Sequence, residues 1–179
     1  MTDLSAIGPM EYHLGDGVAS MNDLSIKPDA RIRQNIMTLE ANMKAYNAEH
    51  GLAEPECPLT HLFAPGVYGR QIFIPKDSLI VGKIHKFAHL NFLMKGRVTV
   101  ATEEGPVQIE GPLMMVSKAG TKRVVYTHED TWWATVHLTN ETDLDKIEEE
   151  IIAPSYASYD ALHDPDVQQL LSHVQEVSR

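Results

Sequence analysis

Two histidines that lie four residues apart are the residues of this chain best suited to chemistry. His85 and His89 stand in the segment GKIHKFAHLNFLMKGR, residues 82–97, where apolar residues surround them. Imidazole titrates near neutral pH and is the commonest metal-ligating side chain. The segment ends in a Gly–Arg turn and continues into the alternating sequence VTV at 98–100. Two imidazoles beside a tight turn between strands therefore indicate a site.

The alternation of side chains along a strand predicts which residues share a face with these histidines. Residues two apart in a strand point to the same side. We therefore expect Asn91 to lie on the face of His89, and Lys83 on the face of His85. Arg123, on a later strand, is expected to face them from another wall of the same cavity.

The first interpretation of this group is a metal site. His85 and His89 would bind a divalent transition metal, with His137 as the best third ligand and with His61 and His128 as weaker candidates. Imidazole ligands suit zinc, iron, nickel or copper, and we also considered manganese. A catalytic metal keeps one position open for its substrate, so three protein ligands would be enough.

The second interpretation is an anion site without a metal. Lys83 and Arg123 are cations, which would repel a metal ion and attract a carboxylate or a phosphate. Arginine binds such groups through two parallel hydrogen bonds. His85, His89 and Asn91 would add further hydrogen-bond donors.

Two further cations and a structural role for the histidines must also be weighed. Arg70 and Lys122, on neighbouring strands, could add positive charge to an anion site. A purely structural role for His85 and His89 is the third interpretation, because clustered ionisable groups mark functional sites only probabilistically. The residues alone leave the three interpretations open.

The central part of the chain predicts a barrel of short strands. Turn residues such as Ala-Pro-Gly, Lys-Gly and Glu-Glu-Gly separate apolar runs of a few residues, which is typical of a sandwich or barrel. The expected strands cover residues 61–63, 68–74, 79–85, 90–94, 97–102, 106–109, 114–117, 122–127 and 132–138.

Helical patterns flank this region on both sides. Apolar residues recur at three- and four-residue steps over 29–50, and again over 143–152 and 165–177. We therefore divide the chain into a flexible N-terminal arm (1–27), a helical extension (28–56), a β-barrel (57–140) and C-terminal helices (141–179).

The histidine segment resembles the first sequence motif of the cupin superfamily. That motif holds two histidines, a glutamate and, seven residues after the glutamate, a glycine. With the glycine placed at Gly96, the three preceding ligand positions fall on Lys83, His85 and His89. The segment GPLMMVSKAGTKR, residues 111–123, is similar to the second motif, and Arg123 falls on its histidine.

The resemblance covers residues 57–140 and implies a mainly β fold, the cupin-type double-stranded β-helix or jelly-roll barrel. It also implies a pocket around the four positions just named, although three of them do not hold the usual ligand. We therefore expect a protein that binds a small polar or anionic ligand, or a divalent metal. A metal-dependent isomerase, oxygenase or hydrolase is one alternative.

A component of a phage virion or its assembly is the other alternative. Segments 60–70, 84–86 and 128–137 are similar in texture to uncharacterised cupin-like proteins of tailed phages and prophages, a resemblance that implies no established activity. In that case the barrel would serve as a scaffold, and virion proteins would be its partners.

Composition narrows the possible partners. The chain has 25 acidic and 15 basic residues, a formal net charge of −10, which argues against extended nucleic-acid binding. A single cysteine excludes a disulfide within the chain. No signal peptide or membrane-spanning run is expected, so we expect a cytoplasmic protein. If a phage encodes it, the location would be the host cytoplasm or the virion. The apolar faces of the flanking helices lead us to expect a homo-oligomer, most simply a dimer.

Overall fold

Antiparallel strands make up most of the part of the chain that the structure describes. The computed structural model describes residues 13–14, 17–18, 30–53 and 55–169. Its strands are β1 (His13–Leu14), β2 (Gly17–Val18), β3 (Leu59–Ala64), β4 (Val67–Ile74), β5 (Leu79–Val81), β6 (Ile84–His85), β7 (His89–Lys95), β8 (Arg97–Thr102), β9 (Gly105–Glu110), β10 (Leu113–Ser117), β11 (Val124–Thr127), β12 (Thr131–Leu138) and β13 (Ile152–Ala153). Its helices are α1 (Ala30–His50), α2 (Leu144–Ile151) and α3 (Tyr156–Leu162).

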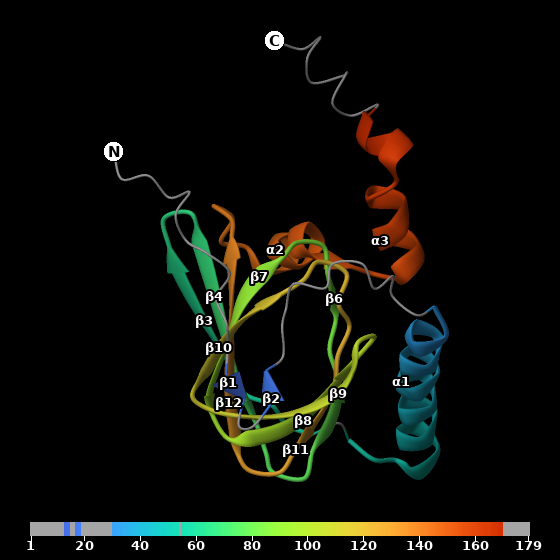
Figure 1. The fold of residues 1–179 in the computed structure, drawn as a ribbon, viewed down its shortest axis with the longest axis vertical. Coiled ribbons are helices and arrows are strands. Elements are labelled where there is room, and N and C mark those ends of the chain that lie inside the picture. The colour runs from blue at the N-terminus through green and yellow to red at the C-terminus, as the bar shows by residue number, and fades with distance from the viewer. Residues whose placement is uncertain (1–12, 15–16, 19–29, 54, 170–179) are drawn as a thin grey trace.

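Two facing sheets form the barrel (Figure 1). One sheet has the order β10-β7-β12-β4-β3 and the other β5-β11-β8-β9. The chain passes between the sheets as it proceeds, since β4, β7, β10 and β12 belong to the first, while β5, β8, β9 and β11 belong to the second. This arrangement is the double-stranded β-helix of the jelly-roll type. The predicted fold class is therefore confirmed.

One expected strand proves to be two. The segment predicted over 79–85 divides into β5, which pairs with β11, and β6, which pairs with β13. The N–H of Gly82 donates to the carbonyl oxygen of Arg123 at 2.8 Å, which is the last bond on the β11 side. The following residues turn to β13, a strand that the sequence did not predict. The alternation of side chains between the two faces of the strand therefore stops at Gly82.

The apolar core fills the end of the barrel remote from the histidines. It consists of inward-facing side chains from both sheets, which pack together with exposures of 6% or less: Leu93, Val98, Val100, Ile109, Val125 and Trp133. Each belongs to a strand whose neighbouring residues point outward, as the alternation of a two-faced sheet requires.

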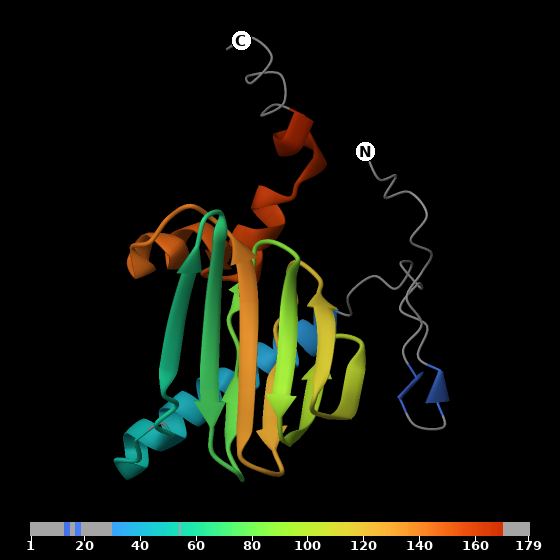
Figure 2. The ribbon, with the colours of Figure 1, turned by 90° about the vertical axis from the view of Figure 1, so that its left-hand side faces the viewer.

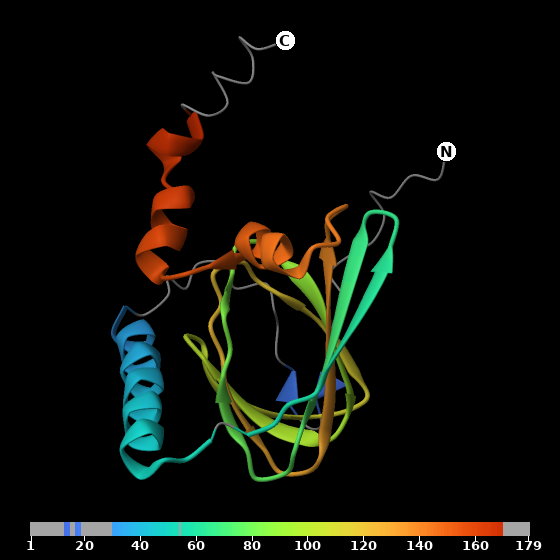
Figure 3. The same ribbon diagram turned by 180° about the vertical axis from the view of Figure 1, so that it is seen from behind.

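Helix α2 covers the other end of the barrel (Figures 1 and 3). Its N-cap is Asp143, whose carboxylate accepts hydrogen bonds from the backbone N–H groups of Asp145 and Lys146. On its apolar face Ile147 and Ile151 are buried and pack against Tyr68 of β4. The helix expected over 143–152 is thus a lid fixed to the barrel by apolar contacts.

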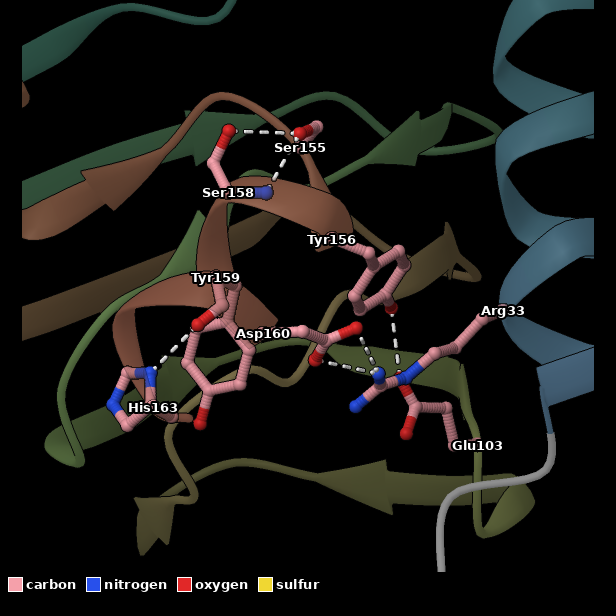
Figure 4. Close-up of polar contacts among 8 residues, drawn as sticks. All are labelled: Arg33, Glu103, Ser155, Tyr156, Ser158, Tyr159, Asp160 and His163. Carbon is pink, nitrogen blue, oxygen red and sulfur yellow. Dashed lines mark hydrogen bonds and ion pairs between the residues drawn. The ribbon is translucent and has the colours of Figure 1, made fainter. Parts of the chain in front are cut away.

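Helices α1 and α3 meet at the turn between β8 and β9 (Figure 4). The Nε of Arg33 in α1 donates to the Oε1 of Glu103 at 2.9 Å, and its Nη1 lies 3.1 Å from a carboxylate oxygen of Asp160 in α3. The hydroxyl of Tyr156 also donates to Glu103, at 2.8 Å. These bonds fix the N-terminal end of α1. Figure 2 shows α1 passing behind the five-stranded sheet, on the far side of the barrel.

Several expectations fall at the ends of the chain. Apart from β1 and β2, which pair with each other, the predicted arm at 1–27 lies outside the described residues. Residues 165–169 are helical, and the rest of the helix expected over 165–177 also lies outside them. The domain boundaries stay a prediction. None of the described helices has the length and apolar composition needed to cross a membrane.

Candidate metal centre and ligand pocket

Three histidines from three strands meet inside the barrel. His85 of β6, His89 of β7 and His137 of β12 each offer a ring nitrogen, and these nitrogens all lie within 4.8 Å of one another. The ring centroids are 4.1 Å apart for His85 and His89, 5.0 Å for His85 and His137, and 4.5 Å for His89 and His137. Among the described residues this is the one group of histidine, cysteine or carboxylate side chains with the spacing of a metal site.

The pairing of β7 with β12 brings two of the histidines together. Val136 pairs with Leu90, so that His137 and His89, the residues next to them, fall on the inner side of adjacent strands. Both are buried, with exposures of 5% and 6%. His85 reaches the same place because β6 leaves the four-stranded sheet and runs towards the end of the barrel under α2.

The hydrogen bonds leave ligand nitrogens without partners. The Nδ1–H of His89 donates to the carbonyl oxygen of Phe87 at 3.1 Å, an arrangement that puts the ring's lone pair on Nε2. That Nε2 is buried and has no hydrogen-bond partner, and the same is true of Nδ1 of His85. An unpaired buried polar atom is costly. The two nitrogens therefore fit a bound ion or ligand.

The electrostatic surroundings keep the imidazoles neutral. Burial lowers the pKa of His85 to about 2, with His89 and His137 as further causes. Burial, together with the charge of His89, lowers the pKa of His137 to about 4. Burial also lowers the pKa of His89, against the opposing effect of its bond to Phe87. Neutral imidazole is the form that binds a metal.

Two guanidinium groups lie beside the histidines. The Nη2 of Arg123 donates to Oγ of Ser117 at 2.6 Å, and Ser117 pairs directly with His89 across β10 and β7. The Arg123 side chain is thus held next to His89, and burial lowers its pKa. Arg70 reaches the same cavity from β4, where it pairs with Thr135 of β12.

The other cations expected near the site point elsewhere. Lys83 borders the pocket, but it lies between β5 and β6, and its ammonium group pairs with Glu148 of α2. Gly82 and Lys83 lie outside both strands, so strand alternation does not place Lys83 on the face of His85, and its part in the site stays a prediction. The Nζ of Lys122 is buried in an ion pair with Glu40 of α1 at 2.9 Å.

The two weaker histidine candidates also lie outside the cluster. The Nδ1 of His61 lies 2.7 Å from the hydroxyl oxygen of Tyr68. The Nε2 of His128 lies 2.8 Å from Oγ1 of Thr99, on the other sheet. Both therefore have hydrogen-bond partners of their own, whereas the three clustered histidines face each other.

The inner face of the five-stranded sheet is arranged in rows across its strands. We call Arg70, Thr135 and Asn91 the polar row, since Thr135 pairs with Arg70 on one side and with Asn91 on the other. The histidines lie on one side of this row. On its other side lies an apolar row, Ile72, Trp133 and Leu93, which continues into the core. Thr135 was not predicted, although it lies two residues from His137 and therefore on the same face.

A pocket of about 700 Å³ opens from these rows towards α1. Its walls include the polar row, His85 and Arg123 at one end. The remainder of the wall comes from the second half of α1 and the segment after it, from β4, β5 and their connections, and from β11 and β12: Glu40, Met43, Lys44, Asn47, Leu52, Ala53, Pro55, Cys57, Ile72, Ile74, Asp77, Ser78, Leu79, Ile80, Val81, Gly82, Lys83, Val125 and Trp133. The site is therefore reached from the side of α1, while α2 covers the end of the barrel.

Comparison with solved structures returns cupin-domain proteins. A cupin domain from Bordetella pertussis is 14% identical at a TM-score of 0.40, over 49% of this chain and 98% of that one. A cupin-2 domain protein from Shewanella frigidimarina is 9% identical at 0.40, over 52% and 92%. An RmlC-like cupin with a double-stranded β-helix fold from Methanocaldococcus jannaschii is 13% identical at 0.40, over 48% and 82%.

These likenesses concern the fold alone. No family model and no curated protein matches the sequence. The jelly-roll barrel is established by its strand order and register. The resemblance to phage proteins and the cytoplasmic location stay predictions.

Proposed function

We propose that the protein binds one divalent transition metal through His85, His89 and His137, and that it presents this metal to a small anionic molecule. The observation that supports the proposal is the cluster of three neutral imidazoles, of which His89 and His137 are buried and His85 is half-buried. Two of them, His85 and His89, have a buried ring nitrogen without a hydrogen-bond partner. A purely structural histidine would be expected to satisfy both of its nitrogens.

The donor set favours certain metals. Three imidazoles without a carboxylate suit zinc, iron, nickel or copper, whereas magnesium and calcium require oxygen ligands. Ring nitrogens that all lie within 4.8 Å of one another could serve as ligands of a single ion. Three protein ligands leave coordination positions for an outside molecule, to which the metal supplies Lewis-acid chemistry.

The arginines support an anionic partner for the metal. A divalent ion held by neutral histidines keeps its full charge, and Arg123 and Arg70 add two more positive charges nearby. Concentrated positive charge in a partly closed pocket favours an anion. The metal and anion interpretations of the sequence thus combine in one site. The enzyme alternative would use the same residues.

Titration with Co²⁺ tests the metal site, because the visible absorption of Co²⁺ reports its coordination. We expect one equivalent to bind metal-free protein with the spectrum of a four- or five-coordinate site. His89→Gln should weaken Co²⁺ binding by at least about a hundredfold, the upper range for losses from the supporting shell of a metal site. His128→Gln, outside the cluster, is the matched control. Equal binding by the two variants would contradict the proposal.

A further inference from the structure

We infer that the pocket takes a monocarboxylate with an apolar body, whose carboxylate lies at the polar row and whose body lies along the apolar wall towards α1. The inference rests on the proposed function only where it takes a metal to lie beside the ligand. The position and class of the ligand are argued from the polar and apolar rows, which line the pocket whether or not a metal is bound.

Asn91 supplies the first argument. It is 1% exposed, and its Oδ1 accepts a hydrogen bond from Nε1–H of Trp133 at 2.8 Å. Because the indole nitrogen only donates, this bond fixes which end of the amide faces Trp133. The Nδ2 of Asn91 must therefore point away, and it is buried without a partner. The site thus contains a fixed donor that requires an acceptor atom.

The neighbours of Asn91 extend the same pattern. The Oγ1 of Thr135, directly across from Asn91 on β12, is also buried without a partner. Arg70 follows in the same row, and Arg123, which lies immediately before β11, also lines the cavity. The row offers an amide, a hydroxyl and a guanidinium, which together match the two oxygens of a carboxylate.

One wall of the pocket is apolar, although charged and polar residues also line it towards α1 and the β4–β5 turn, among them Glu40, Lys44, Asn47 and Asp77. The apolar wall separates this ligand from a small inorganic ion. Below the polar row lie Ile72 and Trp133, and the wall continues through Ile80 and Val125 to Met43 of α1. A phosphate would leave these side chains without a partner. An aliphatic or aromatic body would cover them, and each additional methylene should tighten binding by about fourfold.

Calorimetric titration with hexanoate, acetate and 1-hexanol tests the inference, in parallel on metal-free and Zn²⁺-loaded protein. We expect hexanoate to bind more than tenfold more tightly than either acetate or 1-hexanol. Thr135→Val should weaken hexanoate binding by about five- to tenfold, while Thr99→Val, on the outer face of β8, should leave it unchanged.

The outcomes separate this inference from the metal proposal. Equal binding of hexanoate and 1-hexanol, or equal effects of the two threonine variants, would overturn the carboxylate pocket even if Co²⁺ binds. Tight hexanoate binding that depends on Thr135 in protein that binds no Co²⁺ would support the pocket and overturn the metal centre. Stronger binding of inorganic phosphate than of hexanoate would overturn the ligand class.

A second observation is independent of the pocket and concerns the outer face of the five-stranded sheet. The outward residues of its strands include one charged side chain, Lys95 at the end of β7, which lies over the ring of Trp132. Six large apolar ones are 40% exposed or more: Leu62, Leu90, Met94, Met114, Val116 and Leu138. Figure 2 shows this sheet facing the viewer, with α1 behind it and α2 above it. None of the described helices covers the face.

The geometry points to a second copy of this chain as the occupant. The six side chains expose on the order of 600 Å², near the ~800 Å² per partner of a standard interface. Apart from Lys95 at the end of β7, the face has no charged side chain, so it can pack against its own copy without burying further unmatched charge, even though each chain carries a net charge of −10. The strand β12 is central in the sheet, so a twofold axis there would bring equivalent strands together.

Light scattering of the full chain tests this interface. We expect a dimer of the 20.0 kDa chain at micromolar concentration. Leu90→Glu should give a monomer with an unchanged circular dichroism spectrum, and Val107→Glu, exposed on β9 of the other sheet, should remain a dimer. A monomeric wild type, as would result if residues 1–29 cover the face instead, would overturn the inference, as would a dimer that survives Leu90→Glu.

Discussion

Acid should destabilise the metal-free protein through its buried histidines. In the folded state the pKa of His85 is lowered to about 2 and that of His137 to about 4, whereas an unfolded histidine titrates near 6.5. The unfolded chain therefore binds more protons below pH 6.5. The stability that these groups contribute is complete above pH 6.5 and is lost as the pH falls towards 4 for His137 and towards 2 for His85.

The size of the effect follows from the same values. One pH unit in this window costs about 1.4 kcal/mol for each histidine that stays neutral in the folded state. Between pH 6.5 and 5 each of the two histidines should thus cost about 2 kcal/mol, and the pair about 4 kcal/mol. Domains of this kind have total unfolding free energies of about 5–15 kcal/mol, so the loss should be easy to measure.

Urea unfolding at pH 7 and pH 5 in the presence of a chelator measures this difference. The double variant His85→Gln/His137→Gln cannot take up the protons, so its free energy of unfolding should change by at least about 2 kcal/mol less than that of the wild type over this range. The free energy of unfolding is compared between the two pH values within each protein. The test therefore does not depend on how stable the variant is at either pH. If both proteins lose stability in parallel between pH 7 and 5, the reasoning about the cluster is refuted.

Two further predictions concern the barrel and its lid. A Cβ at Gly96, where φ is +106°, would lie 2.5 Å from Oγ1 of Thr131 and 2.9 Å from the carbonyl oxygen of Asp130, so Gly96→Ala should cost about 3 kcal/mol or more. Gly105 has a similar φ of +104° but nothing within 4 Å of a Cβ, so Gly105→Ala should cost only about 1 kcal/mol in the same urea assay; equal costs would contradict the packing argument. Ile147→Ala should cost about 3 kcal/mol, because this 2%-exposed side chain fixes α2 over the barrel, whereas the exposed Leu144→Ala should cost less than about 1 kcal/mol. A loss of less than 1 kcal/mol for Ile147→Ala would mean that α2 is not held by this contact.

The barrel could be predicted from the sequence because the patterns that mark its strands lie within short segments of the chain. Turn residues separate the strands, and alternating apolar residues mark the inner face, as Leu93 and Val98 show with exposures of 0%. The same alternation brings His89 and Asn91 to one face. Alternation did not determine the direction of His137, because that depended on the length of the turn at 128–130, and the structure shows it buried in the cluster.

What the sequence could not provide was the pairing of distant segments. The sequence pattern continues the strand of His85 back to Lys83, but β6 begins at Ile84 and pairs with β13, which lies after α2. Thr135 and Arg70 become neighbours of Asn91 only through the register of three strands. No local pattern shows that register, so the polar row could be recognised only in the folded structure.

The most direct test of the metal centre is elemental analysis of freshly purified protein. The account predicts close to one equivalent of zinc, iron, nickel or copper per chain in the wild type, and less than about a tenth of that in His89→Ala, with both proteins folded by circular dichroism. Equal metal contents in the two proteins, or a wild type that neither contains a transition metal nor takes one up from a metal-supplemented buffer, would contradict the account.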